Sequence, residues 1–147
     1  MSLDVHLYSK RPADEVIIQD VLVSQNGAKT QLTLAELRQS FPGCEIECPD
    51  EDECVFDANI THNLGKMAEE AGVYMCCWRP DEIGAKQAKD IIPILDAGFK
   101  LLTDNPSRFT KFNPENGWGS YVDLVDFVSS YLSACKSCPE AVIEVSR

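Results

Sequence analysis

The sequence has few basic residues and few residues of the kinds that usually carry catalysis. Its 147 residues include 13 Lys and Arg against 24 Asp and Glu, a net charge of −11, and only two histidines, His6 and His62. Nucleic-acid binding needs clustered Lys and Arg for phosphate contacts, so this balance argues against it. The surplus of carboxylates is compatible with a basic partner protein, or with solubility alone.

The chain also lacks a long hydrophobic run. No apolar stretch approaches the roughly 18 residues that a membrane span needs, and residues 1–10 lack the apolar centre of a secretory signal. We therefore expect a cytoplasmic protein that does not bind membranes. Thiols stay reduced in that compartment, so the seven cysteines are not expected to form a disulfide framework.

No P-loop, GxSxG, HExxH or dinucleotide glycine pattern is present, and the sequence indicates no cofactor. Cys135 and Cys138 have CxxC spacing and are weak candidates for a zinc site, because one such pair is only half of the usual signature. The pair ends a helical pattern, where the helix dipole disfavours a thiolate. Redox catalysis is therefore not expected.

Length and composition indicate one globular domain, residues 1–147. Alternating or β-branched segments predict strands at 4–9, 15–24, 30–33, 44–48, 54–60 and 141–145, with a hairpin turn at 26–27. Helical periodicity and capping residues predict helices at 33–39, 63–71, 80–102 (kinked at Pro93) and 120–135, while 73–78 reads as a strand or a packed connector. The expected fold is α+β: a mainly antiparallel sheet of the N-terminal strands and the C-terminal strand, covered on one face by three main helices.

Polar side chains gather where a predicted strand meets a predicted helix. Asn59, Thr61, His62 and Asn63 lie there, beside backbone N–H groups that a helix start leaves free, which favours binding of an anion or a carbonyl group. His62 is the best, though weak, candidate for a general base. The alternative is that Thr61 or Asn63 only caps the helix and His62 lies on its surface.

Two further stretches combine aromatic and polar residues. Trp78 and Arg79 precede a helix start and could bind a carboxylate or phosphate, or could be a core residue and a partner for a carboxylate. The turn at residues 113–121 offers a flat apolar face and amides, which suit a small-molecule site, although amides in turns commonly bond to the turn's own backbone. Its candidate ligand-binding residues are Asn113, Asn116, Trp118 and Tyr121.

An acidic run from Glu45 to Asp57 contains seven carboxylates and no basic residue. It lacks the glycine that a calcium loop of this type needs at its sharp turn. Such a run is usually a solvated loop, and contact with a basic partner is the alternative.

The C-terminal two-thirds of the chain resembles a group of small proteins from bacterial genomes, prophages and phages, for which no activity is established. The resemblance rests on residues 59–67 (NITHNLGKM), 78–80 (WRP) and 113–121 (NPENGWGSY), the last being the most specific; it does not extend to the chain through Glu53. It implies a shared fold and a phage or host-interaction context. It also suggests that the two Asn-rich stretches face each other across one cleft.

We therefore favour a non-enzymatic binding or interaction protein, a phage- or prophage-related accessory that recognises a small polar ligand or a partner protein. Its working surface would combine the two Asn-rich stretches with Trp78 and Arg79. One alternative is a small enzyme that acts on a polar metabolite, with His62 as base and Arg79 holding an anion. Another is an acidic inhibitor or immunity-type protein that occludes a basic site on its partner. The sequence leaves homo-oligomerisation open.

Overall fold

The computed structural model describes residues 1–10, 17–22, 29–33, 35–36, 39 and 52–147. Contacts within the chain group into two compact units. One comprises Met1–Ser9 with Cys54–Arg147, and the other Lys10–Glu53. That the two units behave as a single domain stays a prediction. No helix among the described residues is long and apolar enough to cross a membrane.

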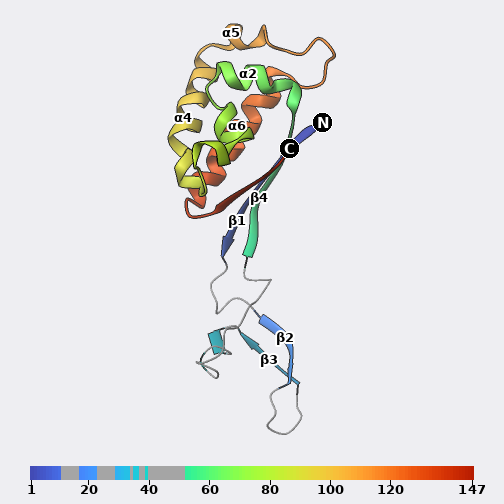
Figure 1. Ribbon diagram of the computed structural model, residues 1–147, viewed down its shortest axis with the longest axis vertical. Helices are drawn as coiled ribbons and strands as arrows, with labels where there is room; N and C mark the ends of the chain where they lie inside the picture. The colour runs from blue at the N-terminus through green and yellow to red at the C-terminus, as the bar shows by residue number, and fades with distance from the viewer. Residues whose placement is uncertain (11–16, 23–28, 34, 37–38, 40–51) are drawn as a thin grey trace. The chain divides into compact units, whose positions relative to one another are not determined.

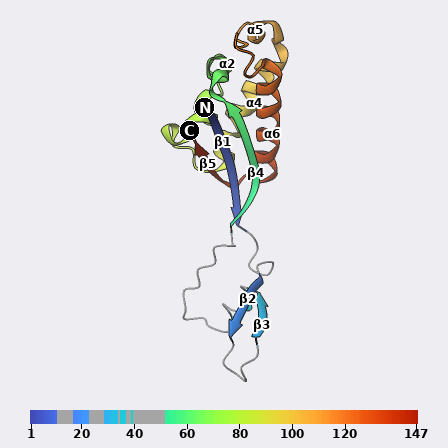
Figure 2. The same ribbon diagram turned by 90° about the vertical axis from the view of Figure 1, so that its right-hand side faces the viewer.

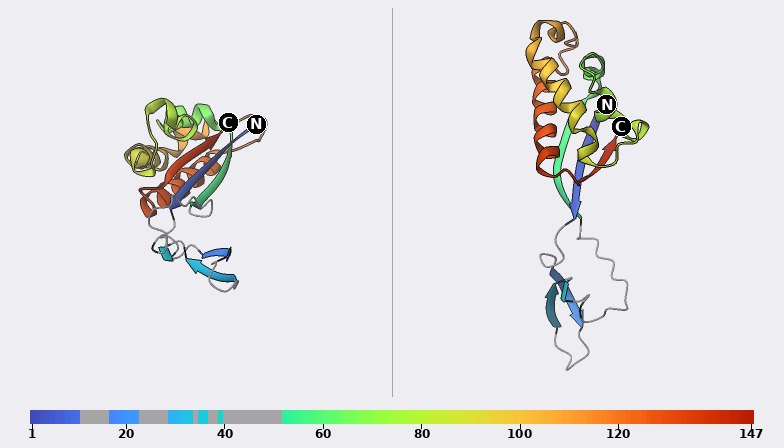
Figure 3. Two further views of the ribbon diagram at one scale, coloured as in Figure 1. Left: turned by 60° about the horizontal axis from the view of Figure 1, so that its bottom comes forward. Right: turned by 90° about the vertical axis from the view of Figure 1, so that its left-hand side faces the viewer.

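The larger unit contains a three-stranded antiparallel sheet in the order β4-β1-β5. Its strands are β1 (Ser2–Lys10), β4 (Asp52–Thr61) and β5 (Val142–Ser146), and Figure 3 shows them side by side. β1 pairs with β5 from Asp4↔Ser146 to Tyr8↔Val142. The prediction that the C-terminal strand joins the N-terminal strands is confirmed, and its partner is β1.

The strands have one buried and one open face, as the alternation of β1 predicts. Leu3, Val5 and Leu7 are fully buried, whereas the intervening residues are partly exposed. The helices lie on one side of the strands (Figure 1) and cover this buried face, so the α+β prediction is confirmed. They are η2 (His62–Leu64), α2 (Gly65–Glu70), α3 (Tyr74–Trp78), η3 (Pro80–Ile83), α4 (Ala88–Asp104), α5 (Pro106–Thr110) and α6 (Tyr121–Ser137).

The region from Pro80 to Leu102 differs from the single long helix that the sequence predicts. η3 ends at Gly84, whose φ of +72° lies in the left-handed region. α4 begins only after Gln87, where the Asp90 carboxylate accepts the Gln87 backbone N–H at 3.0 Å and closes a capping box. The prediction failed because Pro80 and its acidic neighbours are equally suited to a short helix. Pro93 lies inside α4, as predicted.

Residues 73–78 are also corrected. Of the two predicted readings, a strand is wrong, because Tyr74–Trp78 is the short helix α3, which packs between α2 and η3. α2 stops where Gly72 adopts a φ of +77°, which allows the chain to turn immediately into α3. Cys76, Cys77 and Trp78 are buried there, so the apolar run reflects core packing rather than a strand.

In the smaller unit, β2 (Ile17–Leu22) pairs antiparallel with β3 (Lys29–Thr33) in a sheet of its own. The predicted pairing of these two strands is thus confirmed. Ala35, Glu36 and Gln39 are helical, within the predicted helix at 33–39. The predicted turn at 26–27, the predicted strand at 44–48 and the acidic run before Asp52 lie outside the described residues.

Candidate binding groove

The junction between β4 and η2 is built by a local cap. Thr61 is extended, and its Oγ1 accepts the backbone N–H of Asn63 at 3.3 Å, so of the two capping residues considered from the sequence it is Thr61 that caps η2. The strand therefore passes directly into a helical turn. His62 and Asn63 leave the sheet at this point, with His62 half-buried and Asn63 exposed.

A hydrogen bond fixes the His62 ring. Trp78 is 1% exposed, and its indole Nε1–H donates to His62 Nδ1 at 2.9 Å. Because Nδ1 is the acceptor, the neutral imidazole carries its proton on Nε2. No described residue accepts a hydrogen bond from this Nε2–H. His62 is thus an oriented hydrogen-bond donor, held by a buried indole.

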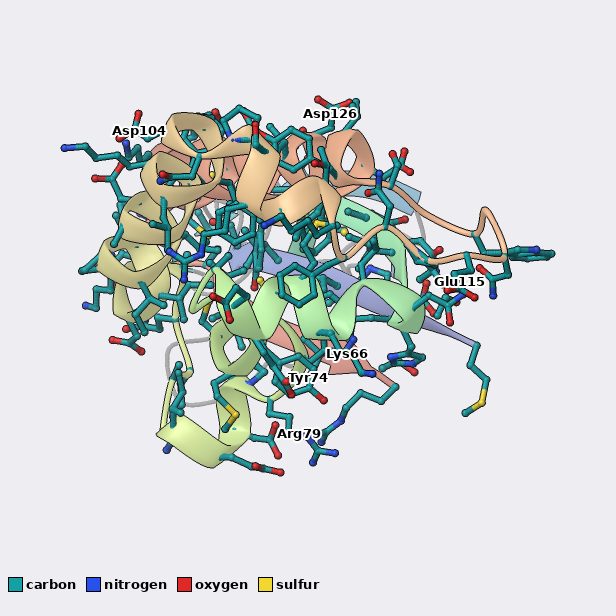
Figure 4. The ribbon with its side chains drawn as sticks, turned by 90° about the horizontal axis from the view of Figure 1, so that it is seen from above. Lys66, Tyr74, Arg79, Asp104, Glu115 and Asp126 are labelled. Atoms are coloured by element: carbon teal, nitrogen blue, oxygen red, sulfur yellow. The ribbon has the colours of Figure 1, made fainter. Side chains whose placement is uncertain are left out.

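Tyr74 and Arg79 lie next to the hydrogen-bonded pair of Trp78 and His62. The Tyr74 ring stacks on Trp78 with centroids 5.4 Å apart and planes inclined by 14°. The Arg79 guanidinium follows directly after α3 and pairs with Glu82. Hydrogen bonds with Tyr74 and then with Glu82 raise the pKa of Arg79 above its ordinary value. Figure 4 shows Tyr74 and Arg79 close together, on the opposite side of the view from Asp126.

Chain segments distant in sequence surround a groove of about 940 Å³ at this place. Its lining includes two guanidiniums, one imidazole, amides and aromatic rings, and no carboxylate side chain. We call it the donor groove. It is lined by Met1, Ser2, Asn59, Thr61, His62, Asn63, Tyr74, Trp78, Arg79, Trp118 and Arg147.

The second Asn-rich stretch lies against the first. Asn63 Nδ2 is 3.5 Å from the Trp118 carbonyl oxygen, to which it donates. Gly119 has a φ of +97°, and a Cβ there would lie 2.7 Å from Thr61 Cγ2. Only glycine combines this backbone conformation with so close an approach. The structure therefore brings together the two stretches that the resemblance suggests are neighbours.

Trp118 is 72% exposed at the edge of the donor groove. An adjoining hollow of about 590 Å³ shares His62 and Asn63 with it. That hollow carries Lys66 and Lys111 and one carboxylate, Glu115. Positive charge thus extends from the donor groove along the loop.

The other candidates from this loop have structural contacts. Asn116 Oδ1 accepts the Trp118 backbone N–H at 3.0 Å, and Asn113 Oδ1 accepts that of Tyr121 at 2.7 Å. The Tyr121 hydroxyl donates to the Leu102 carbonyl at 2.7 Å. Asn116 thus closes a turn within the loop, Asn113 ties the loop to the start of α6, and Tyr121 joins α6 to α4; none of the three lines the donor groove. They hold Trp118 in its position.

Asn59 lines the donor groove from β4, and its amide donates to the Asp4 carboxylate. The weak zinc candidates lie elsewhere, because Cys135 is buried in the core and Cys138 caps the end of α6. Burial, with a smaller effect of Cys76, raises the pKa of Cys135 to about 12, so this thiol stays protonated at neutral pH. Among the described residues, no three His, Cys, Asp or Glu side chains form a group that could hold a metal ion.

The sequence did not identify Tyr74 and Arg147 as groove residues. Tyr74 lies four residues before Trp78, a helical spacing that becomes informative only once residues 74–78 are known to be a helix. Arg147 reaches the groove because β5 pairs antiparallel with β1. The chain matches no protein-family model, no curated protein and no solved structure.

Proposed function

We propose that this protein is a non-enzymatic binding protein whose donor groove takes an anionic ligand, a carboxylate or a phosphate attached to a flat apolar group. The observation that carries the proposal is the Trp78–His62 hydrogen bond. It leaves the imidazole Nε2–H as a donor, in a groove that also holds Arg79 and Arg147 and has no carboxylate side chain in its lining.

Charge and shape support this class of ligand. Guanidinium groups bind carboxylate and phosphate in a bidentate manner, and their planar forks lose little entropy in doing so. Arg79 and Arg147 are held from outside the groove by Glu82 and Asp81, which orients them without adding acid to the lining. The exposed indole of Trp118 offers a flat face for the apolar part of the ligand.

The Trp78–His62 hydrogen bond also argues against the alternative in which His62 is the general base of an enzyme. A general base needs a free lone pair aimed at the substrate. The lone pair of His62 Nδ1 receives the Trp78 N–H, and Nε2 carries the proton. Protonation at Nδ1 would break the bond that orients the ring. The phage or prophage context implied by the resemblance stays a prediction, as does the acidic inhibitor.

The test uses simple anions as probes. Phenyl phosphate and benzoate are titrated into ¹⁵N-labelled protein, with benzyl alcohol as the neutral control of the same shape. We expect saturable shifts of the Trp118 indole and Arg79 Nε–H signals, with dissociation constants of about 1–10 mM, which corresponds to two or three charge-assisted hydrogen bonds after the cost of association.

Two variants make this test specific. Arg79→Gln should weaken phenyl phosphate binding about tenfold, because it removes one bidentate contact. Arg108→Gln is the matched control, since Arg108 pairs with Glu70 and does not line the donor groove. If neither anion shifts the signals, or if both variants bind phenyl phosphate equally well, the proposal is wrong.

A further inference from the structure

β4 is an edge strand among the strands that the structure describes. β4 ends the strand order β4-β1-β5, and no described strand pairs with its second edge. The His62 backbone N–H, directly after β4, donates to the Met1 carbonyl at 3.4 Å. The backbone N–H of His62 therefore points toward β1. Backbone groups alternate in direction along a strand. The N–H and C=O groups of Asp57 and Asn59 and the N–H of Thr61 therefore point away from β1, toward the outer edge, whereas the Thr61 C=O begins the hydrogen bonding of η2.

A groove of about 560 Å³ beside this edge is lined by residues of β4 and α6. Figure 2 shows these two elements side by side. Phe56, Ile60 and Phe127 contribute apolar surface to it. Asp57 on β4 and Asp123 and Asp126 on α6 contribute carboxylates, and no Lys, Arg or His lines it. We call it the acidic groove.

The three carboxylates are only lightly neutralised. Asp57 Oδ1 lies 3.5 Å from His6 Nδ1, and Asp123 accepts the Ser120 hydroxyl at 2.8 Å. Asp126 has no hydrogen-bond or ion-pair partner among the described residues. All three are exposed. The acidic groove therefore attracts cations. The donor groove, which shares Asn59 and Thr61 with it, has the opposite charge.

We propose that the outer edge of β4, with the acidic groove, binds an extended basic segment of a partner protein as an added strand. The backbone groups of Asp57 and Asn59 and the N–H of Thr61 supply the hydrogen bonds, and basic side chains of the segment meet carboxylates on both sides of the edge. Phe56–Thr61 spans roughly 20 Å, enough for six residues of a peptide. A free amine or polyamine would not use the open backbone groups.

Charge excludes the other occupants of a sheet edge. A second copy of β4 in this position would bring Asp57 and the α6 carboxylates against their equivalents, which costs energy. Nucleic acid would meet the same repulsion from its phosphates. The proposal does not depend on an anionic ligand in the donor groove.

The test uses a blocked, fluorescently labelled octapeptide with the repeat Lys-Lys-Val-Val, which presents lysine on both faces of an extended strand, and the corresponding Glu-Glu-Val-Val peptide as control. We expect the Lys peptide to bind in fluorescence anisotropy, and the Glu peptide not to bind. D57N/D126N should weaken binding about 5–10-fold at low salt, because it removes two screened ion pairs. Asp104→Asn is the matched control, because Asp104 is an exposed carboxylate outside the acidic groove.

Backbone methylation distinguishes an added strand from mere charge attraction. The Lys peptide is compared with one that is methylated on every backbone nitrogen. The methylated peptide keeps its charges but cannot donate hydrogen bonds to β4 in any register or direction, so it should lose binding. Equal binding of the methylated and unmethylated peptides, or D57N/D126N binding as well as Asp104→Asn, would overturn the proposal. Arg79→Gln should bind the Lys peptide normally, which separates this result from the donor groove.

Discussion

Replacing His62 by alanine removes the acceptor of a buried donor. Trp78 is 1% exposed, and its indole N–H has His62 Nδ1 as its partner, 2.9 Å away. In the variant this N–H would lose its hydrogen bond within the core. A buried donor left without a partner costs about 1–3 kcal/mol, and the loss of half-buried ring contacts adds to this cost. We expect the midpoint of thermal unfolding to fall by roughly 2–4 °C for each kcal/mol lost.

A double-mutant cycle separates the hydrogen bond from packing. Trp78→Phe removes the donor, so His62→Ala should cost about 1–2 kcal/mol less in that background than in the parent protein. His62→Asn is the conservative control. Its side-chain oxygen, like Nδ1, is bonded to Cγ and can accept the indole N–H, so most of the stability should be retained.

The assay is urea unfolding followed by far-ultraviolet circular dichroism, because Trp78→Phe alters the fluorescence. A coupling energy within about 0.3 kcal/mol of zero would mean that the hydrogen bond contributes nothing. Trp78 would then not orient the His62 ring through this bond. A variant that unfolds non-cooperatively is replaced in the cycle by His62→Gln, which keeps a polar side chain of similar size.

Two further results are expected. Gly119→Ala should lower the free energy of unfolding by about 1–3 kcal/mol, because alanine is strained at a φ of +97° and its Cβ would approach Thr61 Cγ2. Gly117→Ala is the matched control, since Gly117 has a φ of +73° but a Cβ there would meet no atom within 4 Å. Urea unfolding should show a smaller loss of stability for Gly117→Ala than for Gly119→Ala. Cys135 holds its proton longer in the folded than in the unfolded protein, since burial raises its pKa from 9.0 to about 12. Its stabilising contribution is therefore present below pH 9 and lost between pH 9 and 12, with a slope of up to about 1.4 kcal/mol per pH unit. For Cys135→Ala, urea unfolding between pH 9 and 12 should show a smaller decrease of the free energy of unfolding per pH unit. An unchanged decrease would contradict a raised pKa of Cys135 in the folded protein.

Local signals in the sequence were sufficient where the physics is local. Thr61 caps η2, Ser120 Oγ accepts the Asp123 backbone N–H at 3.3 Å, and Gly72 takes the positive φ that ends α2. The two hydrogen bonds join residues two and three positions apart, and the φ of Gly72 is a property of a single residue. The prediction failed where such signals compete, because Pro80 suits the start of a short helix as well as of a long one.

The donor groove depends both on features that the sequence determines and on features that only the tertiary structure determines. The sequence by itself determined that residues 59–63, 78–79 and 118 carry recognition-type side chains, because residue type and capping position can be read locally. Only the tertiary structure decided that Trp78 donates to His62, 16 residues earlier, and that Asn63 meets Trp118 across 55 residues. It also decided that the β1–β5 pairing brings Arg147 to the same groove. Contacts between distant residues depend on how the elements pack around a shared core, and no short stretch of sequence contains that information.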